Sequence, residues 1–230
     1  MKNIIYGKNS VLDAVSNNFP IEKLMIDRNL KDKTNIKFNN ISYVSRFELD
    51  KLCEGNHQGF VAIIKDFQYH DLGSIFKDKP NFVLMLDHIQ DPQNFGSIIR
   101  TCNAFNIKHI IIPKNRAVDV TPTVLKVSSG GFNNVKIIKV ASLFDATNDL
   151  KKNNFWIYAT ALDKNAKKLH QVTFASPTCL IVGNEETGVS KTLINNSDEV
   201  VFIEQNGIVQ SLNVSAATAI LVYELTKEKK

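Results

Sequence analysis

Hydrophobic and polar residues alternate over the first 65 positions in a pattern that predicts a small α/β unit. A helical pattern begins near Ser10, and a second helix is expected over residues 47–53. The expected strands of this unit span residues 21–27, 41–44 and 59–65. A polar stretch with Gly73 and Pro80 follows, as is typical of a connection. We therefore expect a first domain over residues 1–67, a linker over 68–80 and a second domain over 81–230.

After Pro80 the apolar stretches become longer and richer in Val, Ile and Leu, which indicates strands that are buried on both faces. These expected strands span residues 82–86, 109–112, 135–140, 155–160, 179–182 and 200–203. Helical patterns lie between them or after the last one, at residues 95–105, 118–127, 143–151 and 212–225. Strands that alternate with helices predict an α/β fold in which a parallel sheet carries helices on both faces.

Three polar loops follow strands in this second part, at residues 87–94, 183–188 and 205–207, and the last two contain glycine. Because the carboxyl ends of parallel strands lie at one edge of a sheet, we expect these loops to meet there. Ligands of open α/β sheets bind at that edge, so the sequence predicts a site formed by all three loops.

Charge and cysteine content restrict the class of protein. The chain has 230 residues, a formal charge of +5 and a pI near 9.0, which favours a polyanionic partner, although basic residues such as Lys227 also suit a solvated tail. Cys53, Cys102 and Cys179 form no CxxC pair and are compatible with a reducing cytoplasm. No signal-peptide core and no membrane-spanning segment is expected.

Familiar nucleotide and metal motifs are missing from the sequence. Neither GxGxxG nor GxxxxGK[ST] occurs, so a dinucleotide or P-loop site is not expected. The five histidines lack metal-ligand spacing, so no metal is expected. Local physics gives ordinary roles to the remaining candidates: Arg100 as a solvated arginine or a phosphate ligand, Glu185 as a polar residue at a helix start, and Ser211 and Asn213 as helix caps.

Three segments taken together resemble the signature motifs of the TrmH/SpoU family of RNA methyltransferases. They are residues 94–101 (NFGSIIRT), 183–190 (GNEETGVS) and 208–215 (IVQSLNVS). The resemblance implies a SPOUT fold with a carboxyl-terminal trefoil knot, S-adenosylmethionine as methyl donor, and a homodimer. Residues 5–7, 11–15 and 57–59 resemble the small L30e-like RNA-binding domain of the branch that methylates a guanosine ribose in 23S ribosomal RNA.

The resemblance also assigns roles to residues of this sequence. It implies that Arg100 is the catalytic arginine and that four polar residues frame the site, namely Asn94, Glu185, Ser211 and Asn213. It implies that the methyl donor lies against Gly183, Ile203, Leu212, Thr160 and Leu162. A free guanidinium titrates far above neutrality, so we expect Arg100 to orient a phosphate and to stabilise a developing alkoxide, while the phosphate or Arg100 itself takes the proton.

Two departures from the family pattern affect donor binding more than the type of reaction. Glu186 stands where relatives often have Gly, and Glu204-Gln205 stands where they have Pro-Met.

The expected activity is 2′-O-methylation of a ribose, with ribosomal RNA favoured over transfer RNA as the substrate. The alternatives are a transfer RNA 2′-O-methyltransferase, methylation of a base nitrogen, and a catalytically silent RNA-binding protein of ribosome assembly.

Overall fold

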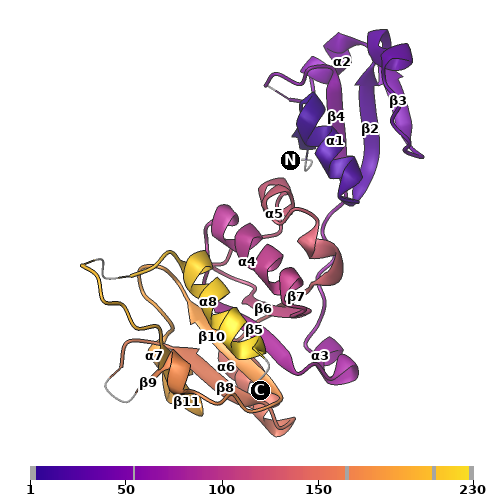
Figure 1. Cartoon of the computed structure of the whole chain (residues 1–230). Coiled ribbons are helices and arrows are strands. Elements are labelled where there is room, and N and C mark those ends of the chain that lie inside the picture. Colours follow the sequence, from indigo (N-terminus) through magenta and orange to yellow (C-terminus); the bar gives the residue numbers. More distant parts are fainter. Residues whose placement is uncertain (1–3, 54, 164–165, 209–210, 228–230) are drawn as a thin grey trace.

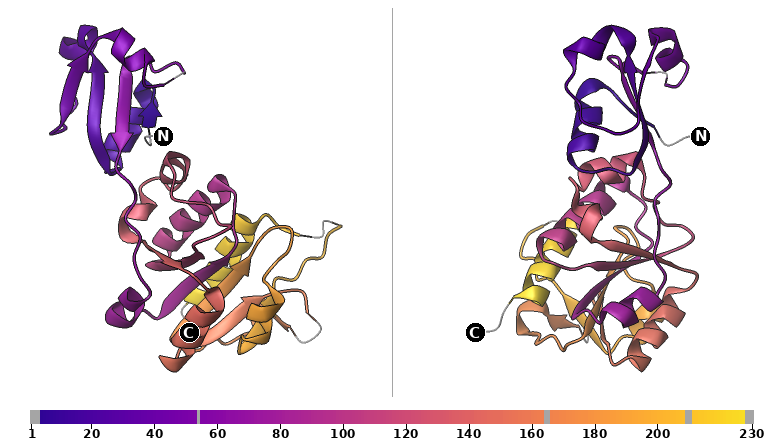
Figure 2. Two further views of the ribbon diagram at one scale, coloured as in Figure 1. Left: turned by 180° about the vertical axis from the view of Figure 1, so that it is seen from behind. Right: turned by 90° about the vertical axis from the view of Figure 1, so that its right-hand side faces the viewer.

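A computed structural model describes residues 4–53, 55–163, 166–208 and 211–227. Two separate sheets organise these residues, and Figures 1 and 2 show them in two units that lie end to end, joined by one crossing of the chain. Gln210, the first residue of the expected Gln-Ser-Leu-Asn run, lies outside the described residues.

The amino-terminal unit holds a four-stranded sheet in the order β1-β4-β2-β3. Its strands are β1 (Ile4–Tyr6), β2 (Ile21–Asp27), β3 (Ile41–Val44) and β4 (Phe60–Ile64). β2 and β3 are parallel, and the other pairs are antiparallel. Its helices are α1 (Lys8–Ser16), the short η1 (Arg28–Lys33) and α2 (Arg46–Asp50), which a Ser45–Glu48 capping box begins.

The second unit contains a seven-stranded sheet in the order β7-β6-β5-β10-β8-β11-β9, and every pair in it is parallel. Its strands are β5 (Phe82–Asp87), β6 (His109–Pro113), β7 (Lys136–Val140), β8 (Trp156–Thr160), β9 (Lys167–Lys168), β10 (Thr178–Gly183) and β11 (Glu199–Phe202). All residues of β10 are buried, as expected for a central strand with helices on both sides.

Helices cover both faces of this sheet (Figure 1), which confirms the expected fold class. One face packs against α4 (Pro92–Ala104), α5 (Pro122–Val127) and α8 (Val214–Thr226), with the short η2 (Gly131–Asn134) and η3 (Leu169–Gln171). The other packs against α3 (Gly73–Asp78), α6 (Leu143–Lys152) and α7 (Lys191–Asn195).

Two helices begin later than the apolar pattern predicted. The helix expected over residues 118–127 begins at Pro122, because Pro favours the first helical position and the Thr121 hydroxyl accepts a bond from Val124. The helix expected over 212–225 begins at Val214, because the Asn213 side chain caps it. Leu212 therefore lies on the loop before α8 and not on the apolar face of the helix.

The polar stretch 68–80 contains α3, which the sequence did not predict. Ile75 of α3 is fully buried, and Asp78 bonds both His109 and Lys136 at the start of the sheet. His70 pairs with β7, donating to the Ile137 carbonyl at 2.9 Å. This stretch therefore packs against the second unit.

Candidate functional site

The three expected loops lie at the carboxyl ends of β5, β10 and β11, where two cavities adjoin. The first, of about 190 Å³, includes all five residues expected to contact the methyl donor: Thr160, Leu162, Gly183, Ile203 and Leu212. Ser211 and Glu185, expected in the polar frame, also line it. Most of its wall is aliphatic, and Leu162 and Leu212 keep 79% and 39% of their surface exposed at its mouth. We refer to it as the donor cavity.

Gly183 allows the loop after β10 to fold back on itself. A Cβ atom at this position would lie 2.0 Å from the Gly188 carbonyl carbon and 2.1 Å from the Val189 nitrogen. The Gly188 amide donates to the Asn184 carbonyl at 2.9 Å, and Gly188 has a φ of 66° that favours glycine. The backbone can therefore form one wall of the donor cavity only if residue 183 has no side chain.

The same loop is fastened to the end of β5. The carboxylate of Asp87, which is 2% exposed, accepts a bond from the Ser190 amide at 2.7 Å, and the Asn184 amide donates to the His88 carbonyl at 3.1 Å. His88 adopts a φ of 62°, so the chain turns sharply as it leaves the strand. Asp87 and Asn184 were not among the predicted site residues, although both lie in loops that follow predicted strands.

Asn94 joins the three motifs in one chain of hydrogen bonds. Its side chain donates to Glu185 and accepts from the Asn213 amide at 2.9 Å. Asp91 caps α4 by accepting from the Gln93 and Asn94 amides, and Pro92 occupies the first turn, which fixes where Asn94 lies. Asn213 in turn caps α8 through its Oδ1. Three segments that are far apart in sequence are thus held together by Asn94.

A second cavity, of about 680 Å³, adjoins the first and shares Asn184, Glu185 and Gly188 with it. Asn94, Glu186 and Arg116 also line it. Arg116 is exposed, and its guanidinium has no ion-pair or hydrogen-bond partner among the described residues. We refer to this space as the acceptor cavity. Sequence reasoning missed Arg116, because nothing in its local pattern separates it from a solvated arginine.

Two expected site residues, Arg100 and Asn213, line neither cavity; Asn213 is bonded to Asn94 at the border between them, whereas Arg100 has no such link. It lies on α4 and is exposed, and its guanidinium has no hydrogen-bond or ion-pair partner among the described residues. Within one chain its position therefore matches the solvated arginine that local physics favoured.

The two departures from the family pattern occupy different places. Gln205 lines the donor cavity, whereas Glu204 pairs with Lys168 and with His170, at 2.6 and 2.9 Å. The hydrogen bond from Lys168 is the largest of the causes that hold the pKa of the Glu204 carboxyl below its usual value. Glu186 lines the acceptor cavity.

No group of three or more metal-ligating side chains occurs among the described residues. None of the helices among the described residues has the length and apolar character that a membrane-spanning helix needs.

Two family models divide the chain between them. One, described as the SpoU rRNA Methylase family, matches residues 81–223. The chain belongs to this family. The other, described as RNA 2'-O ribose methyltransferase substrate binding, matches residues 4–70. Membership of the SpoU family confirms the expected RNA methyltransferase.

Relatives along the full length agree with this membership. A Staphylococcus aureus (strain MSSA476) protein assigned to the TrmH family of tRNA/rRNA methyltransferases is 32% identical over 98% of this chain and 96% of its own. The AdoMet-bound rRNA methyltransferase from Sinorhizobium meliloti has a TM-score of 0.76 at 24% identity, covering 97% of this chain and 86% of that one. The A. aeolicus TrmH/SpoU tRNA modifying enzyme has a TM-score of 0.58 at 31% identity, covering 64% and 74%.

Proposed function

We propose that this SpoU methylase transfers a methyl group from S-adenosylmethionine to the 2′-hydroxyl of a ribose in structured RNA, and that its target is a guanosine of 23S ribosomal RNA. The observation that carries the proposal is the hydrogen-bond chain from Glu185 through Asn94 to Asn213, at the border of two adjoining cavities. One cavity is aliphatic and the other polar. A methyltransferase needs a pocket for the adenosyl group of its donor beside a polar space for the acceptor ribose, and the two adjoining cavities offer both.

The lining of the donor cavity suits S-adenosylmethionine. Ile203, Leu212 and Leu162 offer apolar walls to an adenine ring, and the Gly183 backbone allows close approach of the donor. When bound, S-adenosylmethionine supplies an electrophilic methyl group. Two solved structures with a similar fold, AviRb from Streptomyces viridochromogenes and the Sinorhizobium meliloti enzyme, contain AdoMet.

The acceptor cavity is the space for the target nucleotide. Arg116 supplies an unpaired guanidinium that can bind a phosphate, and Asn94 lies where it can orient the ribose. Holding the hydroxyl in line with the donor accounts for much of the catalysis expected in such a site. Proton removal from this weak acid falls to a substrate phosphate or to Arg100.

Arg100 acts in this proposal from the partner of a homodimer. It is exposed and lies outside both cavities of its own chain. On the neighbouring helix α8, Ile220 and Tyr223 are 41% and 54% exposed, and Phe105 at the end of α4 contacts Tyr223 with ring centroids 6.2 Å apart. Such an exposed apolar surface suits a symmetric interface.

Mixing two inactive variants tests this arrangement. Arg100→Ala lacks the arginine, and Leu212→Asp disrupts the donor cavity. If Arg100 acts across the interface, subunit exchange gives mixed dimers with one intact site each, and about a quarter of wild-type activity returns. If the mixture stays inactive after subunit exchange has been confirmed, Arg100 does not act in the site of the partner subunit.

The two units have separate roles in the proposed function. We assign residues 1–67 to RNA binding in an L30e-like domain, 68–80 to the connection and 81–230 to catalysis. The substrate-binding match over residues 4–70 supports the first role. We further infer that the carboxyl-terminal segment forms a trefoil knot, a rare topology that the family resemblance implies. The return of α8 to pack beside η3 and α4 supports it.

The test is direct labelling of RNA. Purified protein is incubated with labelled S-adenosylmethionine and unmodified 23S ribosomal RNA or transfer RNA, and the RNA is digested to nucleosides for mass spectrometry. We expect 2′-O-methylguanosine from the ribosomal RNA. A methylated base, or label confined to transfer RNA, would correct the proposed product or substrate, and donor binding without any labelled RNA would contradict the activity.

A further inference from the structure

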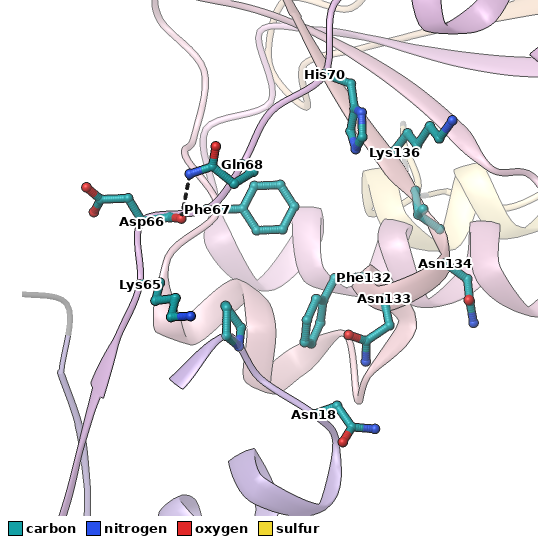
Figure 3. Close-up of a pocket in the computed structure, with 12 residues that line it drawn as sticks. Asn18, Lys65, Asp66, Phe67, Gln68, His70, Phe132, Asn133, Asn134 and Lys136 are labelled. Carbon is teal, nitrogen blue, oxygen red and sulfur yellow. Dashed lines mark hydrogen bonds between the residues drawn. The ribbon is translucent and has the colours of Figure 1, made fainter. Parts of the chain in front are cut away.

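A third cavity, of about 630 Å³, lies between the two units and shares no residue with the donor and acceptor cavities (Figure 3). Its walls come from three segments: the turn before β2, the crossing chain, and η2 with the residues that follow it. The lining residues are Asn18, Pro20, Lys65, Asp66, Phe67, Gln68, His70, Phe132, Asn133, Asn134, Val135 and Lys136. Its volume lies within the range of about 300–1,000 Å³ that small-ligand sites occupy.

Direct contacts hold the two units together around this cavity. The Asn133 amide donates to the Asn17 carbonyl at 2.8 Å, and the rings of Phe19 and Phe132 meet edge to face with centroids 5.1 Å apart. Close contact continues at Gly130, where an added Cβ would lie 2.9 Å from the Asn17 side chain. The cavity is therefore a built space between touching surfaces.

The crossing chain is also fastened at both of its ends. The Lys65 amide donates to the Pro20 carbonyl at 2.7 Å in the first unit. The Tyr69 hydroxyl accepts from the Val120 amide at 2.9 Å and donates to Asp119 at 3.0 Å in the second. Only three residues remain between these anchors, and Phe67 is the middle one.

The chemistry of the lining matches an unpaired nucleotide. Figure 3 shows the Phe67 ring turned toward the open space, with Asn133 opposite and Lys65 beside it. The side chains of Lys65, Asn18 and Asn134 have no hydrogen-bond or ion-pair partner among the described residues, so they are available to a ligand. Aromatic rings stack on splayed-out bases, amides bond to base edges, and lysine binds backbone phosphate.

We propose that this cavity, between the RNA-binding and catalytic units, binds one unpaired nucleotide of the substrate RNA, with its base stacked on Phe67 and its phosphate beside Lys65. The inference rests on the proposed function, because that function makes RNA the ligand of the protein. It adds a contact that neither unit could make alone. Filling the cavity would fix the two units relative to each other on the RNA.

Binding measurements on the full-length protein test the stacking contact. The probe is an unmodified 23S ribosomal RNA transcript, with S-adenosylhomocysteine present so that no methylation occurs. We expect Phe67→Ala to raise the Kd at least about fivefold, since the stacking of one base contributes that much to affinity. Phe67→Trp, which keeps an aromatic ring, should bind with the wild-type Kd. Phe144→Ala, at an exposed phenylalanine on α6 outside the cavity, is the matched control and should bind normally.

Two further measurements separate a contact from a folding defect. Lys65→Gln, at an exposed side chain, should reduce the slope of log K against log salt by about 0.7–0.9, as expected for one lost phosphate contact. Photocross-linking with 4-thiouridine-containing transcript should label peptides that contain Phe67 or Phe132. Calorimetry with S-adenosylmethionine should give wild-type donor affinity for every variant.

The outcomes distinguish this site from the proposed activity. Wild-type affinity in both Phe67→Ala and Lys65→Gln, with cross-links only elsewhere in the protein, would overturn the cavity proposal. Weaker binding and the expected cross-links would support it even if no 2′-O-methylated nucleoside were formed. In that case the proposed function would fail while the cavity proposal stands.

Discussion

Replacing Asn213 with alanine or aspartate separates two functions of one side chain. Asn213 Oδ1 accepts from the amides of Ser215 and Ala216 at 3.0 and 3.4 Å, so it caps α8. Its amide donates to Asn94 at 2.9 Å, so it also supports the polar frame of the site. Loss of a cap costs about 1 kcal/mol, and loss of an exposed hydrogen bond adds about 0.5–1 kcal/mol.

For Asn213→Ala we therefore expect a loss of about 1–2 kcal/mol in the free energy of unfolding, or about 2–8 °C in Tm for a chain of this length. Asn213→Asp retains the acceptor that caps α8, and its charge suits the helix amino terminus, so its Tm should stay within about 2 °C of wild type. It cannot donate to Asn94, whose own amide already serves Glu185. Both variants should therefore lose about five- to tenfold in kcat/KM.

Calorimetric melting and single-turnover methylation check the pair, with S-adenosylmethionine titrations as a control for the donor cavity. Equal melting temperatures for Asn213→Ala and wild type would refute the capping role. Wild-type kcat/KM in Asn213→Asp would refute the view that the bond to Asn94 positions the site.

Further predictions concern the donor loop, the arginine and the dependence of stability on pH. Gly183→Ala places a Cβ within 2.1 Å of the backbone at Gly188 and Val189, so calorimetry should detect no donor binding; normal affinity would mean that the loop can move aside. Arg100→Lys should lower kcat about 100-fold while donor affinity is unchanged, because lysine cannot bind a phosphate through two parallel bonds; near-normal turnover would exclude that role. Burial lowers the pKa of His109 below 6.5, so the unfolded state binds its proton first and stability falls as the pH decreases below 6.5. Urea unfolding at pH 7 and pH 5 should show a smaller decrease in His109→Gln than in wild type, and equal decreases would exclude His109 as a source.

The parallel sheet was predictable because strands buried on both faces have a strong sequence signal. The stretches at β5, β6 and β10 are almost continuously apolar, and all three lie in the centre of the sheet. α3 escaped prediction because it is short and Ile75 is its only buried residue, which leaves no helical apolar pattern in the sequence. β9 has two exposed lysines and gives no apolar signal.

The grouping of the expected site residues was predictable from the sequence, with Arg100 as the exception. All five donor residues line one cavity because they follow strands whose ends meet by topology. Arg100 lies outside both cavities of its own chain, and helical periodicity does not distinguish the proposed role across a dimer interface from that of a solvated arginine. Arg116 became a candidate only when the loop after β6 was seen beside the acceptor cavity.

The short crossing between the units limits how this enzyme could choose its target. Between the bonded residues Lys65 and Tyr69, the chain spans at most about 14 Å even when fully extended. In the proposed arrangement, an RNA held by the first unit would meet the second within a narrow range of separations, and the protein would measure a fixed distance along folded RNA. Distance from the bound element, more than the sequence around it, would then decide which ribose reaches the site, and lengthening the crossing should spread methylation over neighbouring nucleotides.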